Sequence, residues 1–321
     1  MGIIEQATQR LEELRRSGIE VPQRTVPIAP TRGSTVADLP ARAASRFEDL
    51  RRSTATPRSR PEEADVGRGK DRGDAPLLTA HVEIDLARLD VMGYVTPQAP
   101  RSQIADEFRV IKRPIIQNAV GRAGGKIRSA NLVMVTSALP AEGKTFTALN
   151  LAMSVAMEYD HTVLLVDGDV AHPGLPRLLG VPEAPGLLDL LTNDKLDVGD
   201  ALVKTNVEKL SVLPAGTAHR RATELLASEQ MAALLAEIAT RYEDRIIIFD
   251  SPPLLATTEA RVLATHMGQI VMVVAAESTS QNTLNQAMAT IESCEIVLMM
   301  LNKASRTEAG TYGYYAGDDV R

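Results

Sequence analysis

The sequence is poor in cysteine and in aromatic residues. Among its 321 residues there is a single cysteine, Cys294, and no tryptophan. One cysteine cannot form an intrachain disulfide or a zinc cluster, so the composition is typical of a reducing compartment. We expect Cys294 to pack as a small buried apolar residue. Because aromatic residues make up only 3% while apolar residues reach 44%, the expected core is aliphatic.

Long apolar runs and an excess of positive charge are also missing. No uninterrupted apolar stretch approaches the length that spans a bilayer, and residues 1–6 lack the basic start of a secretory signal. We therefore expect a soluble chain whose membrane association comes from a partner or a surface helix. The net charge of −6 argues against a general nucleic-acid binder.

The first part of the chain divides into two unlike segments. Residues 1–20 carry apolar residues at helical spacing, which predicts an amphipathic helix that either docks on a partner or membrane surface or packs on the protein itself. Residues 21–76 are rich in Pro, Arg, Ser, Thr and Glu, and predict a disordered linker. Its arginines could contact anionic lipid, but interrupting acidic residues favour a solvated tether.

A helical lead-in and an α/β core follow. Residues 77–128 include a predicted helix over 100–120, in which Pro114 should kink or restart the helix. From 129 to 304, apolar runs alternate with helical segments, which predicts a doubly wound, mostly parallel sheet with helices on both faces. The predicted strands are Leu132–Thr136, Thr162–Asp167, Leu210–Leu213, Arg245–Asp250, Ile270–Ala275 and Glu295–Leu301.

The first of these strands leads into a glycine-containing loop and then a helix. Residues 138–145 read Ala-Leu-Pro-Ala-Glu-Gly-Lys-Thr, and the predicted helix covers Phe146–Glu158. This strand–loop–helix order is the setting of a phosphate-binding loop, in which backbone N–H groups point at phosphate oxygens. In such a loop Gly143 permits close approach, Lys144 neutralises phosphate charge, and Thr145 offers a hydroxyl to Mg²⁺.

Acidic residues end two further strands. Asp167 and Asp169 follow Val163–Val166, and Asp250 ends the strand before Ser-Pro-Pro. Carboxylates at the carboxyl ends of parallel strands lie where α/β sheets bind ligands. Each could instead belong to an ordinary turn, but their order after a phosphate loop favours a nucleotide site of the P-loop type.

The last predicted segment, residues 305–321, gathers half of the six tyrosines of the chain: Tyr312, Tyr314 and Tyr315. Glycines on either side keep the backbone permissive. This tail could display phenols as phosphate acceptors, or it could form an edge strand or a contact with a neighbour.

Together these motifs resemble the bacterial tyrosine kinases (BY-kinases) that control exopolysaccharide polymerisation. The resemblance covers about residues 100–321 and rests on the Walker A loop at 138–145, the Asp-x-Asp pair at 167–169, the Asp-Ser-Pro-Pro run at 250–253 and the terminal tyrosines. The N-terminal segment and the long linker are similar to the exosortase-associated (PEP-CTERM) subgroup, in which the kinase is a separate chain.

The resemblance implies an ATP-dependent, Mg²⁺-dependent protein-tyrosine autokinase that phosphorylates its own tail in trans. It implies Lys144, Asp167 and Asp169 as catalytic residues and Thr145, Asp167 and Asp250 as those that hold Mg²⁺. The nucleotide would contact Ala141, Glu142, Gly143, Lys144, Thr145, Phe146 and Asn302, and the phosphoacceptors would be Tyr312, Tyr314 and Tyr315.

The implied partners are a membrane-embedded polysaccharide co-polymerase (chain-length determinant protein), a tyrosine phosphatase and further copies of the chain. The protein would then be cytoplasmic and peripheral to the inner membrane through its partner. A ring-like oligomer would use the helix with Asp106, Arg109 and Lys112, which departs from the family pattern Glu-x-x-Arg-x-x-Arg. His172 stands near the position where the family has an Arg before Pro173.

Two other functions fit the same fold. A partitioning ATPase of the MinD/ParA kind shares the P-loop sheet, but Leu139 stands where those proteins carry a signature lysine. A non-catalytic ATP-binding scaffold of polysaccharide machinery remains open as well, because intact motif residues favour catalysis without proving it.

Overall fold

The computed structural model describes residues 80–121, 129–241 and 244–304. The predicted N-terminal helix, linker and tyrosine tail lie outside the described residues. The strands are β1 (His81–Val82), β2 (Leu132–Ser137), β3 (Thr162–Asp167), β4 (Val203–Thr205), β5 (Leu210–Leu213), β6 (Arg245–Asp250), β7 (Gln269–Ala275) and β8 (Val297–Asn302).

These strands form one eight-stranded sheet in the order β1-β4-β5-β3-β6-β2-β7-β8. All neighbouring pairs run parallel except the antiparallel pair β4–β5. From β2 the chain passes to β3, β4 and β5 on one side, returns to β6, and then continues to β7 and β8 on the other side. The prediction of a doubly wound, mostly parallel sheet is therefore confirmed.

Central strands match the predicted ranges closely, and edge strands do not. The bounds of β3, β5 and β6 are the predicted ones, whereas β8 begins two residues later than expected. Neither β1 nor β4 was predicted. They contain two and three residues, too few to show a period. They become strands because β4 pairs with β5 and β1 pairs with β4, which satisfies their backbone groups.

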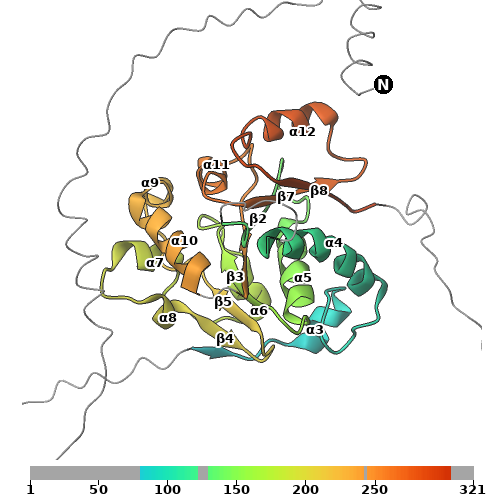
Figure 1. Cartoon of the computed structure of the whole chain (residues 1–321), viewed down its shortest axis with the longest axis horizontal. Helices are drawn as coiled ribbons and strands as arrows, with labels where there is room; N and C mark the ends of the chain where they lie inside the picture. The colour runs from blue at the N-terminus through green and yellow to red at the C-terminus, as the bar shows by residue number, and fades with distance from the viewer. Residues whose placement is uncertain (1–79, 122–128, 242–243, 305–321) are drawn as a thin grey trace, which may run out of the picture. The chain divides into compact units, whose positions relative to one another are not determined.

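Helices cover both faces of the sheet (Figure 1). One face packs against α3, α4, α5 and α6, and the other against α7 to α12. Alternate residues of one strand serve opposite faces: Val133 and Val135 belong to the first core, Leu132 and Met134 to the second. The helices are α3 (Leu86–Val91), α4 (Gln103–Ala119), α5 (Lys144–Ala156), α6 (Leu175–Leu179), α7 (Leu187–Thr192), α8 (Val198–Ala201), α9 (Ala222–Leu226), α10 (Glu229–Arg241), α11 (Thr258–Ala264) and α12 (Gln281–Met288).

Helix α4 runs unbroken through Pro114, so of the kink or restart predicted there, the restart does not occur. Pro114 lies on the exposed side, where water can bond the carbonyl group that loses its helical partner. The opposite side carries Phe108 and Ile115, both buried, and this packing holds the helix together. Ser102 caps its first turn by accepting a hydrogen bond from the Ala105 N–H.

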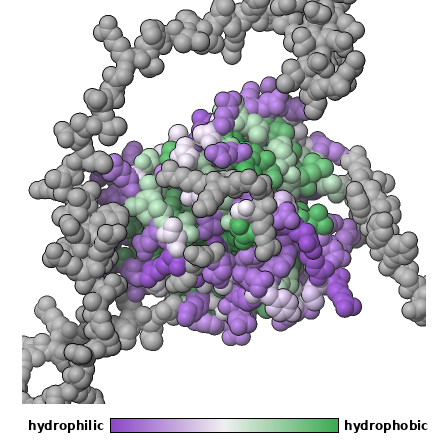
Figure 2. Space-filling model, viewed as in Figure 1, coloured by the Kyte–Doolittle hydropathy of each residue, from purple (hydrophilic) through white to green (hydrophobic). Residues whose placement is uncertain are grey.

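The surface is mixed in character. On the face drawn in Figure 2, hydrophilic residues cover much of the lower half, and hydrophobic ones gather in the upper half. The edge strand β8 carries two exposed large apolar side chains, Met299 and Leu301. Within the described ranges, no helix has both the length and the apolar character that a membrane span requires.

Candidate active site

The phosphate loop connects β2 to α5 at the carboxyl edge of the sheet. Gly143 precedes the first turn of α5 with φ of 102°, a left-handed conformation that costs a side-chain-bearing residue energy. A Cβ atom at Gly143 would also come within 2.0 Å of the Asn302 side-chain nitrogen. Both the backbone conformation and the lack of space therefore require glycine, as the loop motif predicts.

Glu142 holds the loop in shape from inside. Its side chain is buried, and one carboxylate oxygen accepts a hydrogen bond from the Leu139 N–H at 2.6 Å. The other oxygen accepts the hydroxyl of Thr279, in the turn between β7 and α12. The resemblance implies Glu142 as a nucleotide contact, which stays a prediction, and its side chain braces the loop.

Two residues at the end of β8 hold the outer side of the loop. The Asn302 amide donates to the carbonyl oxygen of Glu142 at 2.8 Å, and the Lys303 ammonium donates to the carbonyl oxygen of Ala141 at 2.7 Å. Ala141 has φ of 64°, an unusual conformation for alanine that these contacts stabilise. Thr279 and Lys303 were missed by the sequence analysis because they belong to no motif and meet the loop only through the fold.

Two buried carboxylates stand side by side next to the loop. Asp167 ends β3 and Asp250 ends β6, and the two residues are paired in register across these neighbouring strands. The Thr145 hydroxyl hydrogen-bonds to Asp250. Oδ2 of Asp167 accepts the Leu175 N–H at 3.1 Å, while its buried Oδ1 has no partner. The fold thus brings together the three residues predicted to hold Mg²⁺.

The electrostatics of this pair favour a cation. Burial, reinforced for Asp167 by the charge of Asp250, raises the pKa of each carboxyl group to about 7. The pKa of Lys144 is lowered by burial, an effect that the negative charges of Asp250, Asp169 and Glu142 oppose. A divalent cation would neutralise the two carboxylates and give the unpartnered oxygen a ligand.

The donor set also fits the ion in number. Within the part of the chain that the structure describes, no group of three or more His, Cys, Asp or Glu residues could hold a metal by itself. Mg²⁺ beside a phosphate loop needs fewer protein ligands, because water and phosphate oxygens complete its octahedron. Two carboxylates and one hydroxyl are the kind of partial cage that such an ion uses.

Asp169 lies two residues beyond β3 and is half-buried. It accepts the backbone N–H of His172 at 3.1 Å, and burial raises the pKa of its carboxyl group. A turn therefore fixes Asp169 beside Lys144, close enough that the two charges interact. The imidazole of His172, which stands near the position of the family arginine, is exposed.

An aromatic pair flanks the start of α5. The rings of Tyr94 and Phe146 lie 5.0 Å apart between centroids, and burial together with the charge of Asp250 raises the pKa of the Tyr94 phenol. Phe146 was predicted as a nucleotide contact, while Tyr94 was missed because it lies far from the loop in sequence. Cys294 packs elsewhere, half-buried, with its sulfur 3.4 Å from the Ile296 carbonyl oxygen, and burial raises the pKa of its thiol.

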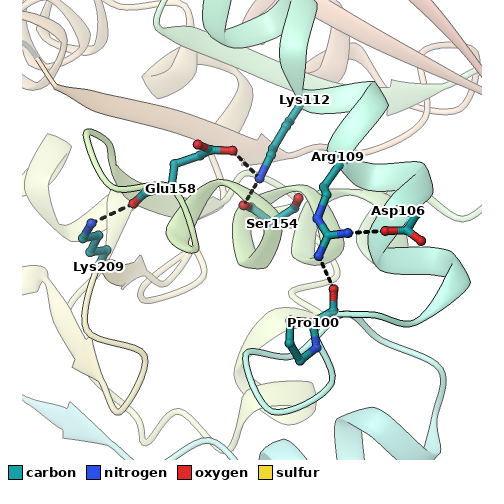
Figure 3. A network of polar contacts seen from close by, with 7 residues as sticks. All are labelled: Pro100, Asp106, Arg109, Lys112, Ser154, Glu158 and Lys209. Atoms are coloured by element: carbon teal, nitrogen blue, oxygen red, sulfur yellow. Dashed lines mark hydrogen bonds and ion pairs between the residues drawn. The ribbon is translucent and has the colours of Figure 1, made fainter. Parts of the chain in front are cut away.

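The predicted oligomer residues on α4 do not share one exposed surface (Figure 3). Asp106 and Arg109 pair with each other in the open, and Arg109 also donates to the carbonyl oxygen of Pro100. The Lys112 ammonium instead points into the protein, where it contacts Glu158 at 2.7 Å and the Ser154 carbonyl oxygen at 2.6 Å. Within one chain, therefore, two of the three residues are available to a neighbour.

Comparisons with known proteins identify the family to which the chain is similar. Residues 140–302 match the AAA domain family. The chain is 30% identical over 222 residues to the putative tyrosine-protein kinase CapB of Staphylococcus aureus, covering 68% of this chain and 93% of that protein. It is 31% identical over 222 residues to the tyrosine-protein kinase YwqD of Bacillus subtilis, covering 68% and 90%.

Among solved structures, the chimerical protein CapA2B2 is similar with a TM-score of 0.54 and 26% identity, over 69% of this chain and 92% of that one.

Proposed function

The chain belongs to the bacterial tyrosine-protein kinases with an AAA domain, and on that premise we propose that it is an ATP-dependent protein-tyrosine autokinase. The observation that carries the proposal is the register pairing of Asp167 with Asp250 beside Lys144 and Thr145. This arrangement supports a site for Mg²⁺ and nucleotide phosphates, with Asp169 at its open side. The proposed substrate is the tail of the chain, with Tyr312, Tyr314 and Tyr315 as phosphoacceptors.

The phosphate loop would bind and orient ATP. The loop N–H groups and the amino end of α5 favour negative charge, and Lys144 adds a full positive charge. Thr145, Asp167 and Asp250 would hold Mg²⁺, which supplies charge neutralisation on the phosphates. Asn302 is the proposed contact to the base, in addition to its hydrogen bond to the loop.

Asp169 is the proposed group that orients the acceptor. The phenol oxygen forms a bond to the γ-phosphorus, the bond to the leaving ADP oxygen breaks, and the phenol proton passes to the Asp169 carboxylate. A raised pKa makes this carboxylate a better base than an ordinary Asp, although placement matters more in a loose transition state.

The wider setting follows from the family. We propose that the kinase regulates exopolysaccharide polymerisation and export, and that it works on the cytoplasmic side of the inner membrane beside a membrane-embedded co-polymerase. The similarity to a chimera named CapA2B2 supports a partner of that kind. A tyrosine phosphatase would reverse the modification. A ring of copies would use Asp106 and Arg109, and phosphorylated tails would repel one another and loosen it.

The test is phosphotyrosine formation by the purified chain with Mg-ATP, read by intact mass and by an anti-phosphotyrosine blot, with and without the co-polymerase segment. We expect up to three added phosphates, none in Lys144→Met, and none in a triple Tyr→Phe tail. Absence of phosphotyrosine in both conditions would overturn the proposal. Phosphate release without tail labelling would identify an ATPase, and nucleotide binding with neither would identify a scaffold.

A mixing experiment separates transfer in trans from transfer in cis. The enzyme is the chain with Tyr312, Tyr314 and Tyr315 replaced by Ala, and the substrate is the Lys144→Met chain with its tail intact. We expect label on the Lys144→Met chain, because it can then come only from its neighbour. Label in the unmixed wild type but none in the mixture would contradict transfer in trans.

A further inference from the structure

A pocket lies beside the acceptor side of the proposed site. Its volume is about 410 Å³, within the range of small-ligand pockets. Seven of its lining residues are apolar, and four of these are prolines: Pro173, Pro176, Pro182, Pro214, Val181, Ala184 and Ala215. The motifs of the nucleotide site do not include any of these residues.

The pocket is joined to the site by the segment that follows Asp169. This segment forms a turn in which the His172 N–H donates to Asp169, and it continues through Pro173 to Pro176 along the pocket wall. A Cβ placed at Gly174 would lie 3.9 Å from the Thr145 side chain, so the same segment also contacts the proposed Mg²⁺ residue. Whatever fills the pocket would lie next to a phenol held at Asp169.

The opposite wall is rigid. Oδ2 of Asp189 accepts the N–H groups of Gly186 at 2.9 Å and Thr217 at 3.0 Å, which fixes the turn after β5. Gly216, the residue before Thr217, has φ of 83° and packs directly against Gly186. Because prolines and this braced turn have few conformations to lose, the pocket is preorganised for a flat, rigid guest.

Basic residues follow one wall of the pocket along the chain, and one acidic residue, Glu183, lines the pocket. Thr217 lines the pocket, and the next residues along the chain include His219, Arg220 and Arg221, all exposed. The tail carries the complementary charge, since Asp318 and Asp319 follow its last tyrosine by three and four residues. An aromatic group flanked by acidic residues is thus the chemistry that the pocket and its rim fit.

We infer that this pocket binds an aromatic ring of the tyrosine tail, next to the tyrosine that accepts phosphate. The role of the bound ring rests on the proposed kinase function, but the binding of the ring does not depend on it. In an extended tail, Tyr312 and Tyr314 point to the same side about 7 Å apart, so one phenol can face Asp169 while the other fills the pocket.

Chain length permits the tail to reach the pocket of its own chain. The tail begins just after Asn302, at the end of β8, and the pocket lies at the end of β5, five strands away in the sheet. Five strand spacings amount to about 24 Å, while the ten residues from Asn302 to Tyr312 span at most about 33 Å to 36 Å. The tail of the same chain is therefore long enough to reach the pocket.

The test is the binding of a fluorescein-labelled peptide of residues 305–321 to the full chain, measured by anisotropy without ATP. The chain carries Tyr→Ala at its own three tail tyrosines, so that its tail does not compete. Ala184→Phe fills the pocket, and Ala289→Phe, at the exposed end of α12, is the matched control. We expect Ala184→Phe to weaken peptide binding about tenfold or more, and Ala289→Phe to leave it unchanged.

Two further arms test what the pocket and its rim recognise. A peptide with Phe for all three tyrosines should bind as the natural one does, while a peptide with Ala should not. Arg220→Glu should weaken peptide binding and should not make that binding more dependent on salt. Arg101→Glu, at an equally exposed position, should leave peptide binding unchanged. Equal binding of the Ala peptide, or equal binding to the Ala184→Phe chain, would overturn the inference.

The outcome is separable from that of the kinase proposal. Ring-dependent peptide binding by a chain that makes no phosphotyrosine would keep the pocket and remove the kinase. Phosphotyrosine formation that is unchanged in Ala184→Phe would keep the kinase proposal and remove the role of the pocket. If both hold, Ala184→Phe should raise KM for the tail peptide while the affinity for ATP is unchanged.

Discussion

The Asn302 side-chain amide donates to the carbonyl oxygen of Glu142 at 2.8 Å, so the last residue of the sheet holds the middle of the phosphate loop. The two residues are separated by 160 positions in the sequence. This bond fills the space beside Gly143 and places the end of β8 at the edge of the nucleotide site.

Asn302→Asp should weaken nucleotide binding, because it exchanges an amide donor for a carboxylate that repels both the loop carbonyl and the phosphates. We expect a loss of about tenfold in affinity, equivalent to about 1.4 kcal/mol. Titration with a fluorescent ATP analogue measures it. Asn285→Asp, on the exposed side of α12, is the control, and an unchanged affinity in Asn302→Asp would argue against the loop contact.

Removing the hydroxyl of Thr279 should destabilise the chain, because one oxygen of the buried Glu142 carboxylate then loses its donor. We expect Thr279→Val to lower the free energy of unfolding by about 1–3 kcal/mol, measured by urea denaturation. Thr283→Val removes a hydroxyl from an exposed pair with Ser280 and should cost much less. Equal effects of the two variants would show that Glu142 does not depend on Thr279.

The pair of Lys112 and Glu158 should respond unequally to the loss of either partner. Lys112 is the buried member, whereas Glu158 is about two-fifths exposed. Glu158→Gln leaves an ammonium group buried without its counter-charge and should cost about 2 kcal/mol, while Lys112→Met should cost about 1 kcal/mol or less. Urea midpoints with matched m-values measure both, and the opposite order would contradict this account.

The same pair predicts a loss of stability in acid. The hydrogen bond and charge of Lys112 lower the pKa of Glu158, so its contribution is present above the ordinary Glu pKa and is lost as the pH falls through the lower folded value. The free energies of unfolding of the wild type and of Lys112→Met are compared between pH 6 and pH 3 (about the Glu range). The difference between them should shrink as the pH falls. A constant difference would remove the ion pair from the explanation.

Asp250→Asn should stabilise the chain without nucleotide at pH values above 7 (about the raised pKa), although it should abolish phosphoryl transfer. The pKa of Asp250 is raised to about 7, so the folded state holds protons that the unfolded state has released, and stability falls as the pH rises from about 4 to 7 and stays low above it. We expect a gain of about 1–2 kcal/mol, seen as a melting temperature higher by a few degrees.

Saturating Mg-ATP provides the control for this prediction. It should stabilise the wild type, because it binds the folded state, and should have much less effect on Asp250→Asn. A variant that is less stable than the wild type at high pH and equally stabilised by Mg-ATP would contradict the proposed role of Asp250.

The sequence by itself determined the parts of this protein whose physics is local. Continuous apolar runs predicted the buried strands β3, β5 and β6 to the residue, because a strand covered on both faces must be apolar along its length. Gly143, Lys144 and Thr145 could be placed at the start of a helix because the loop chemistry and the helix end lie within a few residues of each other.

The tertiary structure decided what depends on contacts between distant segments. Only the packing of β8 and of the β7–α12 turn against the loop gives Asn302, Lys303 and Thr279 their roles. Lys112 looked like an interface residue on its helix, and burial against α5 turned it inward. β1 and β4 are too short to carry a period and exist through pairing. The proline-walled pocket joins segments about 40 residues apart, as its lining from Pro173 to Thr217 shows, and no local pattern encodes such a meeting.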